Sequence, residues 1–152
     1  MKFGLLLIVF SCVVYFGYQI KEKLKSKKIF YEELIAFCED YKREIGFLKC
    51  ELKSIVDRCT KNDGLINEVL IGFIENKECK IDFLKEEEVA EIKSFLLSLG
   101  KQDIDGEINN VDFYEGKFKT KLGEHVQRFD KFGGFSIKMS ALLGLLICVI
   151  LI

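Results

Sequence analysis

The residue best suited to chemistry in this sequence is its only histidine, His125. It falls on a line of apolar side chains with Leu122 and Phe129, and Glu115 occupies another position on that line. An imidazole can act as a base, but neither serine nor cysteine stands at the spacing of a nucleophile paired with it. A polar residue in such a line can instead fix the register of packed helices. We expect the buried position to pass to Val126, leaving His125 at the edge of its helix.

Asp103, Asp105 and Gly106 have the spacing of part of a calcium-binding loop. On the EF-hand pattern, Lys101 would hold the first ligand position and Asp112 the last. A cation in place of the first carboxylate defeats the match, so we expect Asp103 or Asp105 to cap a helix. The chain also lacks a glycine-rich phosphate-binding loop. The sequence therefore predicts no catalytic residue, no metal site and no cofactor, and we do not expect an enzyme.

The cysteines show no metal-binding pattern either. None belongs to a C-x-x-C pair, and with one histidine there is no convincing zinc set. We expect them to be reduced and packed as small apolar groups, whereas a disulfide framework would require an oxidising compartment. The six are Cys12, Cys38, Cys50, Cys59, Cys79 and Cys148.

The composition suits amphipathic helices with hydrophobic ends. In 152 residues, 49% are apolar and 31% are charged, and proline is absent, so no helix loses an amide donor. The net charge of −1 and the scattered basic residues argue against nucleic-acid binding. No strand-like alternation is apparent. We predict an all-α fold, an antiparallel helical bundle flanked by N-terminal and C-terminal transmembrane helices.

Apolar spacing and turn signals divide the middle of the chain into helices. Helical spacing runs from residue 29 to 59, with Gly46 marking either a break or a close packing point. A short helix should follow the turn at 61–64, capped by Asn62 or Asp63, and end near Asn76. For the next helix we expect Asp82 as N-cap and Gly100 at the C-terminal cap.

The stretch from residue 103 to 152 reads as one long helix that begins in water and ends in lipid. Its first half carries apolar residues at alternating steps of three and four, a coiled-coil-like seam. The only loop signal in it is the pair Gly133 and Gly134, where we allow a bend. The seam residues are Ile104, Ile108, Val111, Phe118, Leu122, Phe129 and Phe132.

Both ends of the chain resemble membrane segments. Residues 3–20 carry no charge and would span roughly 27 Å as a helix, so we predict an N-terminal transmembrane helix over 1–20 rather than a signal peptide. Five lysines lie in 21–28, a basic juxtamembrane linker that should stay cytoplasmic. The bundle, 29–131, is then cytoplasmic. The C-terminal transmembrane helix is 132–152; its uncharged part, 139–152, would span roughly 21 Å, which is short for a full crossing unless residues 132–137 are included.

Two groups of residues are candidate contact surfaces. Ser136, Ser140 and Gly144 recur every four residues, so they share one helix face that can approach another membrane helix closely, either the chain's own first span or another protein. An acidic edge and a neighbouring turn form the candidate partner contact, although such edges are usually only solvated. This group consists of Glu86, Glu87, Glu88, Glu91, Lys101, Gln102 and Asp103.

The layout of the whole chain resembles one known family. Its elements are the N-terminal span with a basic exit, the sequence EIGF at 44–47, FLLSLGKQD at 95–103, and SALLGLL at 140–146. In this order and size they resemble stage III sporulation protein AB of endospore-forming bacteria. The family usually has a tyrosine-glycine pair and a proline after the glutamate-isoleucine element, where this chain has Phe47 and Leu48 and no proline. Ser140 replaces the first glycine of its Gly-x-x-x-Gly.

The resemblance implies a component of the channel assembled between mother cell and forespore. The family's soluble region is similar to the platform protein domains of type II secretion and type IV pilus systems, which meet a secretion-type ATPase. We therefore expect a non-enzymatic membrane scaffold in the mother cell membrane facing the forespore, whose partners are the other channel components and the membrane, with no nucleic acid and no small-molecule substrate. The alternative is a homodimerising regulatory or signalling membrane protein with a coiled-coil-like cytoplasmic domain.

Overall fold

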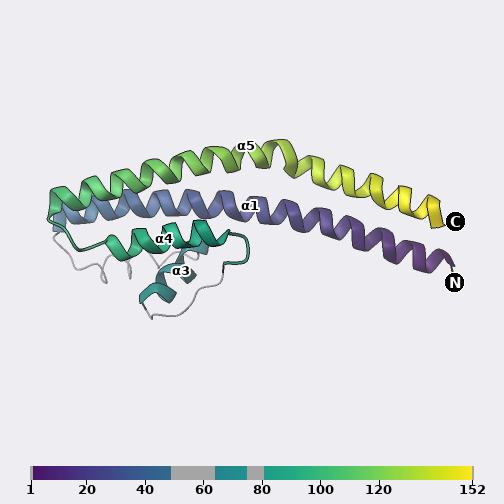
Figure 1. The fold of residues 1–152 in the computed structure, drawn as a ribbon, viewed down its shortest axis with the longest axis horizontal. Helices are drawn as coiled ribbons and strands as arrows, with labels where there is room; N and C mark the ends of the chain where they lie inside the picture. The colour runs from purple at the N-terminus through teal and green to yellow at the C-terminus, as the bar shows by residue number, and fades with distance from the viewer. Residues whose placement is uncertain (1, 49–63, 75–80, 152) are drawn as a thin grey trace. The chain divides into compact units, whose positions relative to one another are not determined.

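The computed structural model describes residues 2–48, 64–74 and 81–151. Across these residues the chain forms α-helices and no strand (Figure 1), so the predicted all-α class is confirmed. The helices are α1, Lys2–Leu48; α3, Leu65–Ile74; α4, Glu86–Ser98; and α5, Ile104–Leu151.

α1 is continuous through the lysine-rich segment 21–28, which we expected only as a linker. It also continues through Gly46, so the helix is not broken there. Among the described residues, nothing lies within 4 Å of a Cβ atom added at Gly46, so none of them packs closely against it. The continuation expected to residue 59 and the proposed caps Asn62 and Asp63 lie outside the described residues.

α3 is tied to α1 through its first turn. The amide of Ile66 donates a hydrogen bond to Glu33 Oε2 at 2.9 Å, which satisfies one of the free N–H groups at the helix start. A Cβ atom at Gly64 would lie 2.9 Å from the same oxygen, so only glycine lets the carboxylate approach this closely. The described part of the helix runs to Ile74, and the end predicted near Asn76 lies outside the described residues.

Residues close in the sequence determine where α4 begins and ends and where α5 begins. The N-cap of α4 is Lys85, whose amide donates to Glu88 Oε2 at 2.7 Å, so the expected cap Asp82 was wrong. The side chain of Glu88 can satisfy this amide because it lies in the first turn. After α4, Gly100 has a φ of 75°, as predicted for a helix terminator. Asp103 caps α5 by accepting from the amide of Gly106 at 3.3 Å.

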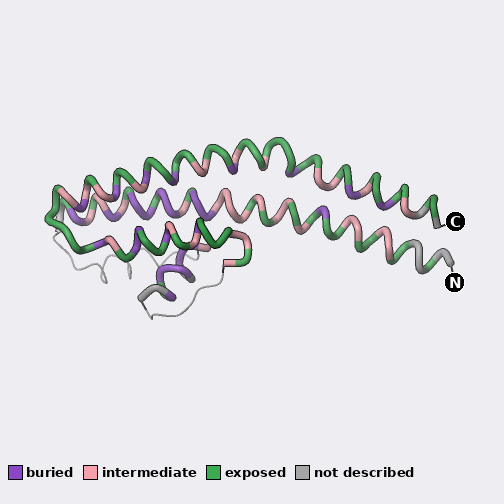
Figure 2. Tube along the Cα trace, in the orientation of Figure 1, coloured by how far each residue is buried: buried purple, intermediate pink, exposed green. Residues whose placement is uncertain are grey.

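The described chain divides into two compact units, and both α1 and α5 contribute to each. Unit 1 comprises residues 1–28 and 124–152, and unit 2 comprises Ile29–Gly123. The bundle expected over 29–131 thus begins where unit 2 begins, whereas unit 2 already ends at Gly123. Figure 2 shows that buried positions are concentrated in the segments that form unit 2.

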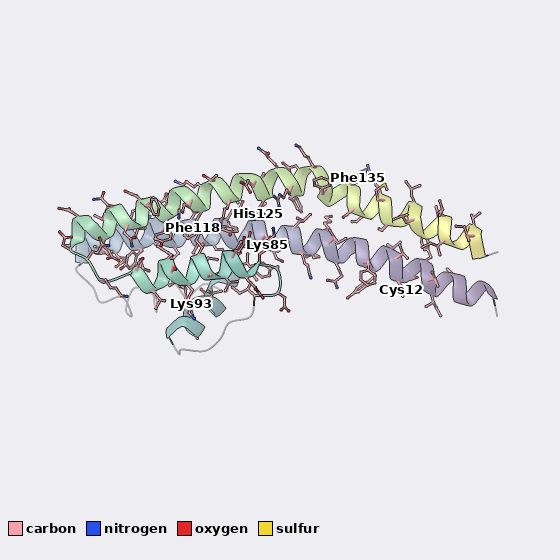
Figure 3. All side chains as sticks on the ribbon, in the orientation of Figure 1. Cys12, Lys85, Lys93, Phe118, His125 and Phe135 are labelled. Atoms are coloured by element: carbon pink, nitrogen blue, oxygen red, sulfur yellow. The ribbon has the colours of Figure 1, made fainter. Side chains whose placement is uncertain are left out.

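Unit 2 is a helical bundle with an aromatic core. Phe95 of α4 packs edge-to-face on Phe37 of α1 and on Phe118 of α5, with ring centroids 6.5 and 5.3 Å apart. Figure 3 labels Phe118 on α5. Such ring pairs add to the hydrophobic gain from burial. α1 and α5 are antiparallel here, because Tyr31 packs near Phe118 while Tyr41 contacts Glu107.

Unit 1 is an antiparallel pair of helices with small residues between them. A Cβ atom at Gly17 would lie 2.8 Å from the Cβ of Ser140, and one at Gly144 would lie 2.8 Å from a ring carbon of Phe10. At the other end of the pair, Lys28 Nζ lies 6.0 Å from the centroid of the Phe129 ring. Glycine and serine thus allow the two backbones to approach closely.

The predicted seven-residue seam of α5 is buried or half-buried from Ile108 to Phe129 and leaves the buried face only at its two ends. Ile104 and Phe132, its first and last residues, are exposed. Val111, Leu122, Gly133 and Gly144, which are buried or half-buried, stand eleven residues apart instead. An eleven-residue repeat corresponds to about 3.67 residues per turn, close to the 3.6 of a straight helix, so a face with a period of 3.5 drifts away over this length.

Candidate functional surfaces

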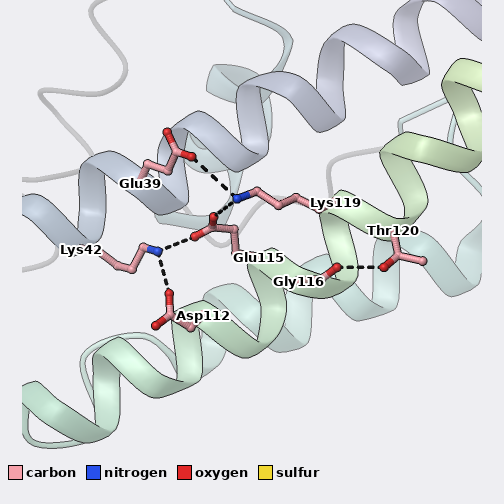
Figure 4. Close-up of polar contacts among 7 residues, drawn as sticks. All are labelled: Glu39, Lys42, Asp112, Glu115, Gly116, Lys119 and Thr120. Carbon is pink, nitrogen blue, oxygen red and sulfur yellow. Dashed lines mark hydrogen bonds and ion pairs between the residues drawn. The ribbon is translucent and has the colours of Figure 1, made fainter.

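A network of charged residues joins α1 to α5 in unit 2 (Figure 4). Glu115, which is nearly buried, binds Lys42 and Lys119, each at 2.6 Å. Lys42 also binds Asp112 at 2.6 Å, and Lys119 lies 3.9 Å from Glu39. Every charge in the network therefore has an opposite charge beside it, which a buried carboxylate requires. The network orients two helices, and its acidic and basic groups neutralise one another.

The pKa values of this network follow from its contacts. Burial raises the pKa of Glu115, but hydrogen bonds from Lys119 and Lys42 outweigh burial and leave it below the ordinary value. The hydrogen bonds to Asp112 and Glu115 raise the pKa of Lys42. Both residues are thus held in their charged forms at neutral pH.

A second polar cluster fixes the connection between α4 and α5. Glu107 Oε1 accepts one hydrogen bond from the Tyr41 hydroxyl at 3.0 Å and another from the amide of Gly100 at 2.7 Å. Burial, together with the charge of Glu107, raises the pKa of Tyr41. One carboxylate of α5 thus holds both α1 and the loop after α4. Sequence analysis missed Glu107, although a glutamate two turns before Glu115 on the same helix face was a signal for it.

α4 and α5 are also joined by polar contacts. Glu91 of α4 accepts from Lys121 and forms an ion pair with Lys117 at 3.5 Å. Burial raises the pKa of Glu91, but the hydrogen bonds and charges of Lys121 and Lys117 lower it by more than burial raises it. The pKa of Glu91 therefore lies below its ordinary value. In addition, the side-chain amide of Asn110 donates to Ser98 Oγ at 2.8 Å.

The predicted acidic edge is only partly a free surface. Glu86 and Glu87 are exposed, Glu88 is buried in the cap of α4, and Glu91 pairs with α5. The four glutamates share one short helix, yet tertiary packing gives two of them to intramolecular contacts. Glu86 and Glu87 therefore remain as the part of this edge that could meet a partner.

The turn named as the second part of this contact is exposed. Lys101, Gln102 and Asp103 all face solvent, and Asp103 additionally caps α5. Asp103 and Asp105 serve the start of a helix, with Asp105 in its first turn. Among the described residues, no group of three or more histidine, cysteine, aspartate or glutamate side chains could hold a metal ion.

His125 and Cys38 are both buried. His125 is only 4% exposed, whereas Val126 is half-buried, so the expectation that Val126 would replace it was wrong. His125 thus stays on the seven-residue line with Leu122 and Phe129, because the helix has not drifted far enough at this point to bury Val126 in its place. Burial, reinforced by the charge of Glu115, raises the pKa of the Cys38 thiol to about 12, which keeps it protonated. Cys12 and Cys38 are free thiols.

The small residues predicted to pack in the membrane face α1 within unit 1. Ser136 Oγ donates a hydrogen bond to the carbonyl of Gly17 at 3.2 Å, while Ser140 and Gly144 lie against Gly17 and Phe10. Of the two partners left open for this face, the structure shows the chain's own N-terminal helix. Gly17 was not singled out from the sequence, although a lone glycine amid large apolar residues was the available signal.

The outward faces of unit 1 are apolar. On α1, Phe16 is 70% exposed, and on α5, Ile150 is 73% exposed. Figure 3 labels Cys12 and Phe135, two further exposed residues of this unit. Contiguous exposed apolar surface marks an interaction or membrane site. The exposed large apolar residues of unit 1 are Leu7, Ile8, Tyr15, Phe16, Tyr18, Ile20, Phe132, Phe135, Met139, Leu142, Leu143, Leu145, Leu146, Val149 and Ile150.

Over the part of the chain that the structure describes, no helix is both long enough and apolar enough to cross a membrane.

Fold and surfaces together define a class of protein: a small helical bundle joined to an antiparallel helix pair with apolar outer faces. Comparison with protein-family models, with curated proteins and with solved structures finds no match to this chain.

Proposed function

We propose that this protein is a non-enzymatic scaffold whose two chain ends anchor it in a membrane and whose helical bundle meets partner proteins in the cytoplasm. The observation that supports it best is the exposed apolar surface of unit 1, on both α1 and α5. In water, fifteen exposed large apolar side chains on two helices would favour aggregation. In a bilayer the same side chains would lie in hydrocarbon.

The interior of unit 1 is consistent with this proposal. Helices in lipid gain little from burying apolar groups against each other, so they associate through small residues and interhelical hydrogen bonds. The contacts of Gly17 with Ser136 and Ser140 are of this kind. The finer proposal, that each end crosses the bilayer, depends on the complete apolar runs of the sequence and places both ends outside the cell.

The first test is topology. Lys101, which is exposed on unit 2, is replaced by cysteine in a background without the native cysteines, and intact cells are treated with a membrane-impermeant thiol reagent. Protection until the cells are opened is the expected result, and co-sedimentation with membranes after alkaline washing should accompany it. Labelling in intact cells would place the bundle outside and overturn the cytoplasmic scaffold, and release by the wash would overturn the anchor.

The particular scaffold we propose is a component of the sporulation channel between mother cell and forespore. Support comes from the resemblance to stage III sporulation protein AB, which the order of the elements along the chain carries. On this proposal the bundle contacts a secretion-type ATPase. The chain should then be made only in the sporulating mother cell. Production during vegetative growth would favour the alternative, a homodimerising regulatory membrane protein.

The contact surface can be tested with the residues that tertiary packing leaves exposed. Reversing Glu86 and Glu87 to lysine should reduce co-purification of the ATPase from sporulating cells, because both side chains face solvent. Reversing the exposed Lys93 to glutamate on the same helix serves as a control for a charge reversal outside this edge. If the variant with Glu86 and Glu87 reversed to lysine recovers as much ATPase as the natural chain, this edge is excluded as the contact surface.

A further inference from the structure

The pairing of α1 with α5 in unit 1 brings lysines from two distant parts of the sequence to one level. One contact, Ser136 Oγ with the carbonyl of Gly17 at 3.2 Å, fixes the pair on the apolar side. The other, Lys28 Nζ at 6.0 Å from the ring of Phe129, fixes it on the polar side. Since the helices are antiparallel, residues 18–27 of α1 and 130–135 of α5 lie between these contacts.

The segments between the two contacts are strongly basic. They contain five lysines and two acidic residues, Glu22 and Asp130. Three of the lysines are exposed, namely Lys23, Lys25 and Lys131. The five, which form what we term the basic collar, are Lys21, Lys23, Lys25, Lys27 and Lys131.

Exposed aromatic and apolar side chains adjoin the collar on one side. Tyr18 and Ile20 of α1 and Phe135 of α5 are each about half exposed. Moving along the pair from the chain ends, exposed apolar side chains, with the exposed Lys138 among them, are followed by aromatic side chains and then by the lysines of the collar. Aromatic residues favour the membrane–water interface, and lysines just beyond it meet the lipid headgroups.

We propose that the basic collar binds the headgroups of anionic phospholipids, so that unit 1 selects these lipids from its surroundings. The inference rests on the proposed membrane anchoring. Charge complementarity supports it, because the segments between the two contacts carry a net charge of 5 − 2 = +3 beside an apolar surface. A lysine close to an anionic leaflet strengthens binding by up to roughly fivefold. The collar needs both helices, since Lys131 joins the α1 lysines only through tertiary pairing.

The experiment uses the full chain with Ile20→Trp as its sole tryptophan, since the natural sequence has none. Ile20 is exposed and adjoins Lys21. The protein is reconstituted into phosphatidylcholine vesicles that contain a fixed fraction of a brominated lipid, either phosphatidylglycerol or phosphatidylcholine. Brominated chains quench tryptophan on contact, so the ratio of quenching reports the lipid preference beside the collar.

We expect several-fold stronger association of brominated phosphatidylglycerol than of brominated phosphatidylcholine at low salt, and a smaller preference at high salt. The triple variant K23Q/K25Q/K131Q should bring the ratio close to one. The matched control K85Q/K93Q/K101Q removes three exposed lysines of unit 2 and should leave the ratio unchanged.

Equal quenching by the two lipids would overturn the anionic-lipid proposal while leaving the membrane anchor intact. A preference that survives in the triple variant would likewise overturn the assignment to these lysines. Absence of quenching by either lipid would instead overturn the proposed membrane anchoring.

Discussion

Aromatic side chains have opposite positions in the two units of this chain. Phe95 and Phe118 of unit 2 are fully buried, whereas Phe16 and Phe135 of unit 1 are mostly exposed. Polar groups show the reverse arrangement, because the surface of unit 2 carries charges while Ser136 and Ser140 of unit 1 face the neighbouring helix. Unit 2 therefore has an apolar core under a charged surface, whereas unit 1 has small polar residues between its helices and apolar residues outside, an arrangement that we propose suits lipid.

The largest expected effect comes from truncating the core of unit 2. Phe95→Ala should lower the free energy of unfolding by about 3–5 kcal/mol, because the ring is fully buried against Phe37, Tyr114 and Phe118. Denaturant unfolding of the chain in mild detergent, followed by circular dichroism, measures it. The same change at the exposed Phe16 should cost far less. Equal losses at both sites would contradict the difference between the units.

The next effect concerns the buried carboxylate of unit 2. Glu115→Gln should lower stability at pH 7 by about 1–3 kcal/mol, because Lys42 and Lys119 lose a charged partner. The pKa of Glu115 is lowered in the folded state. Its contribution is therefore present above the ordinary carboxyl pKa of 4.5 and is lost as the pH falls through the folded value.

Unfolding measured between pH 2 and 7 checks this sign. The variant should show a shallower loss of stability in acid than the natural chain, with part of the slope retained because Glu91 is also shifted downward. Glu87→Gln, at an exposed site, is the control and should leave the profile unchanged. An unaltered acid profile in Glu115→Gln would show that the network contributes nothing to stability.

In unit 1 the expected effect is on helix pairing. Gly144→Leu places a large side chain where even a Cβ atom would meet the Phe10 ring at 2.8 Å, which should cost about 1–3 kcal/mol. Cross-linking of Lys28→Cys to Phe129→Cys by a short bifunctional thiol reagent in a cysteine-free background reports the pairing, because these side chains meet at the other end of the pair, and its yield should fall. Gly134→Leu on the same helix is the control. A Cβ atom added at Gly134 meets no described atom within 4 Å, so this change should leave the yield unchanged.

The smallest expected effect is the change in stability when a helical glycine of unit 2 is replaced by alanine. Gly46→Ala should stabilise the protein by about 0.5–1 kcal/mol, because the residue is helical and a Cβ atom there meets open space. Gly106→Ala should instead destabilise it, since its Cβ would lie 2.6 Å from the capping oxygen of Asp103. Thermal unfolding distinguishes the two. Destabilisation by Gly46→Ala would show that the glycine has a contact or conformation other than the one described.

Local signals along the chain predicted most of the helices, but not the continuity of α1 through 21–28. Proline is absent, apolar residues recur at helical spacing, and both Gly100, which follows α4, and Asp103, which caps α5, act within a few residues of their own position. The cap of α4 was mispredicted because Glu88 satisfies the amide of Lys85 in place of the expected Asp82. Residue types alone do not show which carboxylate, that of Asp82 or that of Glu88, caps α4. The backbone geometry at the helix start decides it.

The sequence by itself determined that this chain is helical, that its ends are apolar and that a small-residue face lies at 136–144. Those properties depend on residue type and short spacing. Only the tertiary structure decided that Gly17 opposes Ser140, that Glu88 and Glu91 are engaged within the fold, and that His125 is buried. The reason is that these outcomes depend on which side chains of separate helices meet, and over the 48 residues of α5 the buried face also drifts from a 3.5-residue period, so that Gly133 and not Phe132 is buried.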